Sequence, residues 1–207
     1  MILSFRPAGA ADADAAVPLI YSSGPATFDY VFAPAGADQA LRFLHAAFRG
    51  GRGEFGHLNH VVALADGAIV GVGAAWDGRA TLRFTLAAAA QILRFYGPVG
   101  AAGVIARGLA VERVIRPPRG DELYVAHLGV REDCRGRGVG AALTRHLLGC
   151  ADRARHRIAS LDVAVTNPRA EALYARLGFS VLALRRSGLA RGDSVVPDHR
   201  RMTLALA

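Results

Sequence analysis

A glycine-rich loop between a predicted strand and a predicted helix is the feature that most constrains this chain. Glu122–Val130 reads as a strand, and Arg135-Gly136-Arg137-Gly138-Val139-Gly140 then opens a helix. A helix N-terminus presents unpaired N–H groups and a partial positive charge. Glycines let the backbone approach an anion closely, and arginines add charge-assisted hydrogen bonds. The segment therefore predicts a cradle for a diphosphate.

Three interpretations of the loop remain open at this point. Gly136-x-Gly138-x-x-Ala141 loosely matches a dinucleotide fingerprint, but few residues follow it, and the acidic candidate Asp162 lies inside a predicted strand. A nucleotide-triphosphate loop requires a lysine, whereas all 25 basic residues of this chain are arginine. In the third interpretation, the glycines form a turn that merely joins a strand to a helix.

Composition bounds the class of protein. A chain of 207 residues with 52% hydrophobic content can build one domain with a buried core. A net charge of +8 suits an anionic partner, but the arginines are scattered without interleaved aromatics, so we expect no nucleic acid. Cys134 and Cys150 form no paired framework. Without a secretory signal or a credible membrane span, we expect no membrane partner and a cytoplasmic location.

The N-terminal half alternates between both kinds of element. We expect a strand at Ile2–Arg6, helices at Asp12–Tyr21 and Asp38–Phe48, and a turn-rich aromatic segment at Ser22–Pro34. Asp66-Gly67 separates the two strands of a hairpin, Leu58–Ala65 and Ala68–Trp76. The Ala-rich stretch from Asp77 to Gly120 predicts one or two helices. With about 44 residues it is too short for its own core, so we interpret it as an insertion between strands.

The C-terminal half is more regular. After the loop we expect a helix from Gly140 to about Arg155, a helix over Pro168–Leu177, and strands at Ile158–Val165, Phe179–Arg185 and His199–Leu206. The strand–helix–strand–helix order makes part of the sheet parallel. The predicted fold is α/β (α+β): a mixed, mostly antiparallel central sheet of about six to seven strands flanked by helices, with a helical insertion between the third and fourth strands.

A second motif narrows the interpretation of the loop. Asn167-Pro168 begins the last helix as N-cap and first helical residue, and Gly178-Phe179 ends it. Together with the glycine-rich loop, this segment resembles the GNAT N-acetyltransferase superfamily. The first motif is filled by Arg135, Gly138 and Gly140, and the second by Asn167, Ala170, Leu173, Tyr174, Gly178 and Phe179. The resemblance covers Glu122 to about Leu184 strongly and the Leu58–Trp76 hairpin loosely.

The resemblance implies a single acyl-CoA N-acyltransferase domain over residues 1–207, with the insertion at about 77–120, and acetyl-CoA as co-substrate. In this superfamily the strands that correspond to Glu122–Val130 and Ile158–Val165 splay apart, and the pantetheine arm pairs with the exposed backbone of the first. Here that backbone would be Leu128, Gly129 and Val130, and an N–H near Val130 would polarise the thioester carbonyl. The implied pyrophosphate ligands are the backbone amides of Arg135, Gly136, Arg137, Gly138, Val139, Gly140 and Ala141, with Asn167 as a further contact.

The resemblance also implies catalytic roles. Tyr174, which would line the coenzyme site as well, would protonate the departing thiolate, because a phenol is a neutral donor at pH 7. The accepting amine must lose a proton, and members of the superfamily often use an acidic residue on the strand before the loop. This chain instead offers Glu122 at the mouth of that strand and His127 inside it, where alternation places His127 on one face with Val125 and Gly129. A water molecule or an already neutral amine remains an alternative base.

The acceptor is predicted only as a primary amine of a small molecule or a peptide. His57, Asn59 and His60 cluster at the hairpin entrance, but their spacing fits no standard metal site, so we expect no metal. The insertion remains open as a lid, a cover for the sheet edge or a dimer contact, and a homodimer is one arrangement that this leaves open. The alternative function is a non-catalytic coenzyme A-binding regulator, which keeps the loop but has no use for Tyr174 as an acid.

Overall fold

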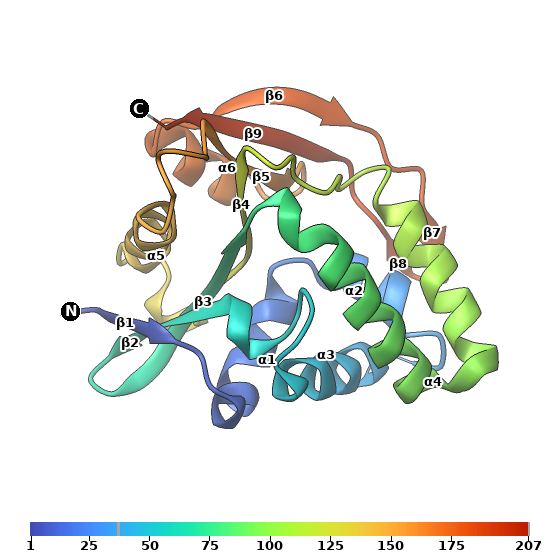
Figure 1. The fold of residues 1–207 in the computed structure, drawn as a ribbon. Helices are drawn as coiled ribbons and strands as arrows, with labels where there is room; N and C mark the ends of the chain where they lie inside the picture. The colour runs from blue at the N-terminus through green and yellow to red at the C-terminus, as the bar shows by residue number, and fades with distance from the viewer. Residues whose placement is uncertain (37, 207) are drawn as a thin grey trace.

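The computed structural model describes residues 1–36 and 38–206 and has at its centre a twisted sheet of seven strands (Figure 1). The strand order is β1-β2-β3-β4-β5-β9-β6. These strands are Ser4–Pro7 (β1), His60–Ala65 (β2), Ala68–Trp76 (β3), Glu122–Val130 (β4), Ile158–Ala164 (β5), Ser180–Arg185 (β6) and His199–Ala205 (β9). The predicted α/β class, the mostly antiparallel sheet and the helical insertion after the third strand are confirmed.

The centre of the sheet is its one parallel junction among the described strands. All other neighbours are antiparallel, whereas β4 and β5 run parallel and pair only at Glu122–Ile158, Leu123–Ala159 and Tyr124–Ser160. Beyond Tyr124 the two strands part, so the rest of this edge of β4 has no strand partner. The sheet is thereby split open at its middle.

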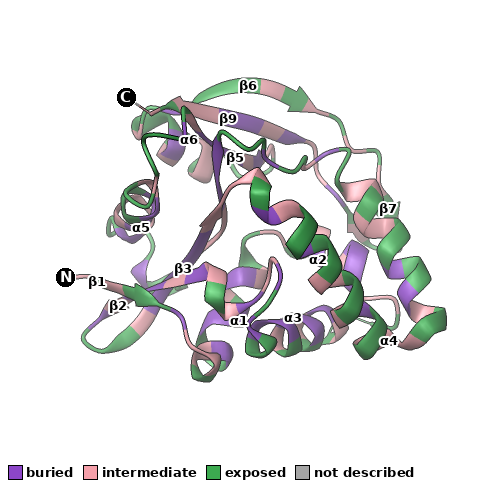
Figure 2. Ribbon diagram, viewed as in Figure 1, coloured by how far each residue is buried: buried purple, intermediate pink, exposed green. Residues whose placement is uncertain are grey.

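Helices cover both faces of the sheet. On one face, Val139–Leu148 (α5) and Pro168–Arg176 (α6) pack over a core that includes Leu143, Leu161 and Met202. On the other, Ala13–Ser22 (α1), Pro25–Phe32 (α2) and Asp38–Gly50 (α3) enclose a second core around Ile20, Phe43 and Phe48. Figure 2 shows buried residues concentrated where these helices and the central strands meet.

The insertion is a helical hairpin. Thr81–Val111 (α4) bends sharply at Gly97, whose φ of 68° and ψ of 172° suit glycine alone, and Pro98 starts the second limb. Figure 1 shows the two limbs of α4 side by side at the edge of the molecule, next to α2. Ile92 from the first limb and Val104 from the second are buried in the core below α2 and α3. Within the described residues, no helix combines the length and the apolar composition that a membrane crossing requires.

Three local expectations differ from the structure. The segment 22–34 was expected to be a turn-rich loop but contains α2, which has Pro25 in its first turn. Helix α5 ends at Leu148 rather than near Arg155, because Gly149 caps it and a turn follows in which Arg155 pairs with Asp152 at 3.0 Å. The short hairpin of β7 (Ala190–Arg191) and β8 (Ser194–Val195) was not expected from the sequence.

Candidate active site

A continuous cavity of about 610 Å³ passes through the split in the sheet. Its lining joins two compartments that meet at β4. One compartment lies between the parted strands and the starts of α5 and α6. The other lies on the opposite face, between β4, α2 and both limbs of α4. The first compartment contains Gly140, Thr144, Asn167, Ala170, Leu173 and Tyr174, and the second Thr27, Phe28, Phe55, Phe84, Ile92, Val104, Gly108 and Glu112.

The glycine-rich loop borders the first compartment, which its two ends, Arg135 and Gly140, line. Gly136 and Gly138 have φ of 75° and 84°, a left-handed conformation that a residue with a Cβ adopts only with strain. In the described part of the chain, none of the backbone N–H groups from Gly136 to Ala141 has a hydrogen-bond acceptor, and the first amide used by the helix is Ala142 N, bonded to Gly138 O at 3.0 Å. Six consecutive free donors at a helix N-terminus suit an anion. Arg135, whose Nε donates to Val130 O at 3.2 Å, lines the cavity beside them.

Helix α6 contributes two of the predicted residues. Asn167 caps it, because its Oδ1 accepts a hydrogen bond from Ala170 N at 3.1 Å, while the residue still lines the cavity. The Tyr174 ring packs against Phe179 with centroids 6.1 Å apart, and burial raises the pKa of Tyr174 above its usual value. Among the described residues, its hydroxyl has no hydrogen-bond partner, so its proton is free for a ligand in the cleft.

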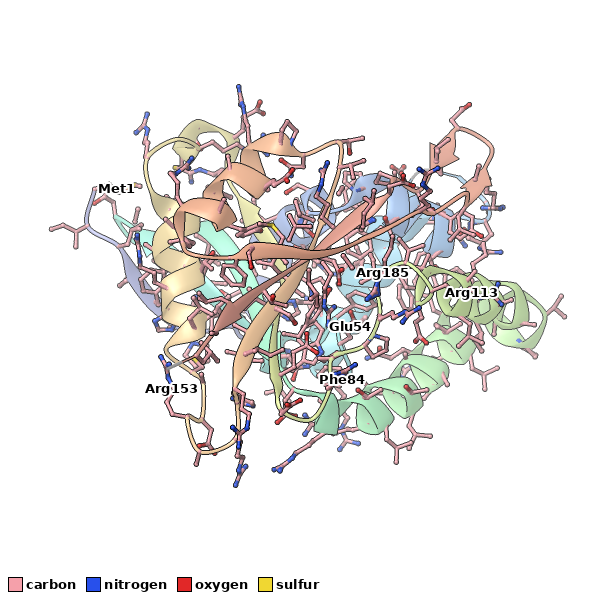
Figure 3. The ribbon with its side chains drawn as sticks, turned by 90° about the horizontal axis from the view of Figure 1, so that it is seen from above. Met1, Glu54, Phe84, Arg113, Arg153 and Arg185 are labelled. Carbon is pink, nitrogen blue, oxygen red and sulfur yellow. The ribbon has the colours of Figure 1, made fainter. Side chains whose placement is uncertain are left out.

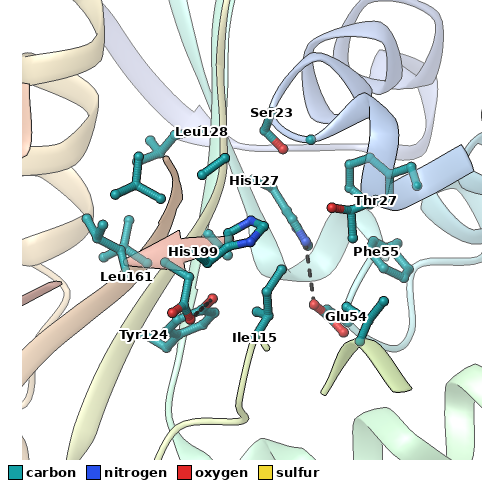
Figure 4. A pocket seen from close by; sticks show the side chains of 18 of the residues that line it. Ser23, Thr27, Glu54, Phe55, Ile115, Tyr124, His127, Leu128, Leu161 and His199 are labelled. Carbon is teal, nitrogen blue, oxygen red and sulfur yellow. Dashed lines mark hydrogen bonds and ion pairs between the residues drawn. The ribbon is translucent and has the colours of Figure 1, made fainter. Parts of the chain in front are cut away.

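A β-bulge in β4 turns His127 toward the second compartment. The register with β3 shifts between Val72 and Ala74, and His127 has a φ of 55°. Simple alternation placed His127 on the same face as Val125. That expectation is wrong, because the bulge adds one residue: Val125 packs under α5, whereas His127 contacts Phe28 and Phe55 on the other face. Figure 4 shows His127 reaching into the cavity toward Glu54.

The proton positions on His127 follow from its partners. His60 is buried, and desolvation lowers the pKa of His60 to about 3, so its ring is neutral. Its Nδ1 donates to the Gly56 carbonyl at 2.9 Å, which leaves His60 Nε2 as an acceptor. His127 Nδ1 therefore donates to His60 Nε2 across 3.1 Å, and the two rings stack at an interplanar angle of 11°. In neutral His127 the lone pair then lies on Nε2, the atom that faces the cavity, 3.5 Å from Glu54 Oε1.

The three residues at the hairpin entrance hold the loop that carries Glu54. His57 Nδ1 donates to Phe48 O at 2.8 Å, Asn59 Nδ2 donates to Gly53 O, and His60 donates to Gly56 O. Sequence reasoning did not identify Glu54 or Phe55 as site residues, and it did not connect His60 with His127. The clustering of His57, Asn59 and His60 in the sequence could have indicated that the neighbouring loop with Glu54 and Phe55 belongs to the site. In the described residues, no three His, Cys, Asp or Glu side chains are grouped to hold a metal ion.

Glu122, the other candidate base, lies in an ion-pair network. Its Oε1 accepts from Arg201 Nη2 at 2.7 Å and its Oε2 from Arg119 N at 3.0 Å. Arg201 Nη1 also bonds Asp162 at 2.6 Å, and Asp162 accepts from Tyr124 Oη at 3.0 Å. Although burial opposes it, these bonds lower the pKa of Glu122. Both carboxylate oxygens are thus engaged below the cavity, which favours His127 over Glu122 as the base.

The second compartment is mostly apolar. Phe84, Ile92 and Val104 come from α4, and Phe28 and Phe32 from α2. Tyr21 and Asp29 do not line the cavity, and the Tyr21 hydroxyl donates to Asp29 Oδ2 at 2.8 Å. Figure 3 shows Glu54 and Phe84 toward the middle of the molecule, with Arg113, just after the end of α4, farther out.

Comparison with known proteins finds acetyltransferases both by family model and by fold. The model of the acetyltransferase (GNAT) family matches residues 30–179. The fold is similar to that of an N-acetyltransferase from Staphylococcus aureus Mu50, with 16% identity, coverage of 97% of this chain and 100% of the other, and a TM-score of 0.69. It is also similar to a GCN5-related N-acetyltransferase from Kribbella flavida, with 23% identity, coverage of 99% and 98%, and a TM-score of 0.58.

A third similar structure was solved with a cofactor. It is a putative acetyltransferase from Salmonella typhimurium with acetyl-CoA, with 17% identity, coverage of 100% of this chain and 95% of the other, and a TM-score of 0.55. No match to the sequence is found among curated proteins. The family model spans the split strands, the glycine-rich loop and helix α6. The chain therefore belongs to the acetyltransferase (GNAT) family and is an N-acetyltransferase.

Proposed function

We propose that this N-acetyltransferase moves an acetyl group from acetyl-CoA to a primary amine by direct attack in a ternary complex. The observation that carries the proposal is the continuity of the cavity across β4. A donor held in the first compartment and an amine held in the second would meet at the unpaired edge of β4, beside His127 and within the same cavity as Tyr174. No covalent enzyme intermediate is then required.

The first compartment fits coenzyme A. The six free amides from Gly136 to Ala141, with Arg135 beside them, would hold the pyrophosphate. The unpaired edge of β4 at Leu128, Gly129 and Val130 would pair with the pantetheine arm as an added strand, because β5 leaves it after Tyr124. Bound acetyl-CoA supplies an activated acetyl group as a thioester.

His127 acts as the general base in this proposal. An ammonium has no lone pair, so His127 Nε2 must take one of its protons before the nitrogen can form the new C–N bond. The His60 contact supports this role, because it keeps the lone pair of neutral His127 on the atom that faces the cavity. Once protonated, His127 has Glu54 as its counter-ion at 3.5 Å.

Tyr174 acts as the general acid. Its phenolic proton passes to the sulfur as the C–S bond breaks, so one proton enters at His127 and one leaves at Tyr174 in each turnover. The raised pKa of Tyr174, caused by burial, keeps the phenol protonated at neutral pH. A backbone N–H near Val130 would stabilise the negative charge that develops on the carbonyl oxygen.

A ligand-binding assay and a thiol-release assay together test the proposal. Acetyl-CoA at micromolar concentration should raise the melting temperature by mass action on the folded state. Free thiol should then appear when amines are added. No thermal shift at millimolar acetyl-CoA would contradict the proposal, and a shift without thiol release from any amine or peptide would favour the non-catalytic regulator instead.

A further inference from the structure

The second compartment has apolar, largely aromatic walls. Its walls come from three separate elements: the two limbs of α4, helix α2 and the loop that carries Phe55. Side chains facing it include Phe28, Phe55 and Phe84, and Trp76 closes the end near β4, with its ring 5.6 Å from that of His127. Apolar walls of this kind hold a ligand by removing its apolar surface from water.

The carboxylates of Glu54 and Glu112 line the cavity beside this apolar space, whereas Asp162, which also lines the cavity, is paired with Arg201. Glu54 is half-exposed and lies 3.5 Å from His127 Nε2. Glu112, at the end of the second limb of α4, lines the same cavity. The pKa of Glu112 is raised, first by burial and second by the negative charge of Glu54, so the two carboxylates lie within electrostatic reach of each other. Arg116 also lines the cavity, and its charge acts on Arg185.

We infer that the acceptor is an amine with a bulky apolar body and no acidic group beside its nitrogen, the ammonium resting between Glu54 and Glu112 and the body lying between α2 and the two limbs of α4. The inference rests on the proposed function and specifies its substrate class. An amino acid places a carboxylate next to the nitrogen, where Glu54 and Glu112 repel it. A small polar amine leaves the aromatic walls without a partner.

Three probe amines separate these features. 2-Phenylethylamine has both the apolar body and the lone ammonium, phenylalanine adds a carboxylate to the same body, and ethanolamine lacks the body. We expect kcat/KM, measured by thiol release from acetyl-CoA, to be at least about 100-fold higher for 2-phenylethylamine than for either of the others. Equal or higher values for phenylalanine or ethanolamine would overturn the inference while leaving the proposed function standing. Thiol release from none of the three, nor from other amines or peptides, would overturn both.

Two sets of variants test where the ammonium and the apolar body of the acceptor bind. Glu54→Gln keeps the side-chain shape but removes the charge, and we expect it to raise the KM for 2-phenylethylamine about tenfold while leaving the KM for acetyl-CoA unchanged. Asp193→Asn is the matched control, an exposed acid in the β7–β8 turn. An equal change in both variants would contradict the placement of the ammonium.

Gly108 allows the apolar space to be filled in steps. It lines the cavity from the second limb of α4, and a Cβ built on it meets no heavy atom within 4 Å. The series Gly108→Ala, Gly108→Leu and Gly108→Phe should raise the KM for 2-phenylethylamine progressively, with the KM for acetyl-CoA constant. Melting temperatures show whether each variant is folded. Folded variants whose KM for 2-phenylethylamine does not depend on the size of residue 108 would place the acceptor elsewhere and overturn the inference.

Discussion

At the scale of single residues, two side chains at the split in the sheet are proposed to carry out both proton transfers. His127 is fixed through His60 and faces Glu54, while Tyr174 lies on α6 and lines the same cavity. In the proposed mechanism, their separation into two compartments gives each a distinct partner, the amine nitrogen for His127 and the thioester sulfur for Tyr174. Three substitutions test these assignments, and a fourth, at His60, tests the burial of the residue that fixes His127.

Replacing Tyr174 by phenylalanine removes the acid but keeps the ring that packs on Phe179. We expect kcat to fall by about 10²–10⁴ with the Kd for acetyl-CoA nearly unchanged, because the hydroxyl is needed only as the sulfur leaves. Steady-state kinetics and a binding titration measure the two quantities. An unaltered kcat would remove Tyr174 from the acid role.

His127→Gln and Glu122→Gln form a pair that separates the two candidate bases. His127→Gln should lower kcat by about 10²–10⁴ and abolish the rise of kcat with pH that reports loss of the proton from the base. Glu122→Gln should mainly lower stability, by about 1–3 kcal/mol, because Arg201 keeps Asp162 but loses one charged partner. If Glu122→Gln abolished the pH dependence and His127→Gln did not, the assignment would be reversed.

His60 predicts a pH dependence of stability. Burial lowers the pKa of His60 to about 3, below the value of about 6.5 for the unfolded chain. Between these values the unfolded chain binds a proton that the folded chain excludes, so stability is retained above about pH 6.5 and falls as the pH is lowered. The limiting slope for this one group is about 1.4 kcal/mol per pH unit. Urea unfolding at pH 4.5–7 should show a shallower slope for His60→Gln than for the parent, and parallel slopes would contradict the burial of a neutral His60.

At the scale of elements, the hairpin shape of α4 depends on the bend at Gly97. The φ of 68° and ψ of 172° at Gly97 allow the second limb to return along the first. Gly97→Ala should cost about 1–3 kcal/mol of stability, since alanine is strained in this conformation. Gly108→Ala, in the second limb with open space at its Cβ, should instead be neutral or stabilising by up to about 1 kcal/mol. Chemical denaturation measures both, and equal effects would mean that the bend does not depend on glycine.

The sequence predicted helices and strands best where particular residues mark the ends of the element. Strand β4 was predicted with its observed bounds, and Asn167, Pro168 and Gly178 marked the ends of α6 to within one residue. Helix α2 was missed because its turn residues and aromatics resemble a packed loop. The bulge at His127 was missed because an alternating pattern does not report an inserted residue.

The candidate site was predicted only in part for a physical reason. The loop from Arg135 to Gly140 and the segment from Asn167 to Tyr174 are contiguous motifs, so their residues could be named in advance. His60 and His127 are 67 residues apart in sequence, and Glu54 reaches His127 from a loop between α3 and β2. Such contacts exist only after the sheet forms, and a single sequence does not encode them as a pattern.

At the scale of the whole molecule, the split sheet connects the compartment proposed to hold acetyl-CoA with a compartment walled by the helical hairpin of α4. The glycine-rich loop, β4, α4 and α6 all fall within the family match, and the loop, β4 and α6 are proposed to form the coenzyme side. The two limbs of α4 wall the other side, where the acceptor is proposed to bind. In the proposed mechanism, acetyl transfer depends on the coenzyme side, and the choice of acceptor depends on the helical hairpin.

The most direct test of the central claim is product stoichiometry. The full chain is incubated with acetyl-CoA and 2-phenylethylamine, while free thiol is measured by colorimetry and N-acetylated amine by mass spectrometry. Transfer through one ternary complex predicts one thiol for each N-acetylated amine, with both products reduced in parallel by His127→Gln. Thiol released without acetylated amine, with this probe and with a wider panel of amines and peptides, would contradict acetyl transfer to an amine.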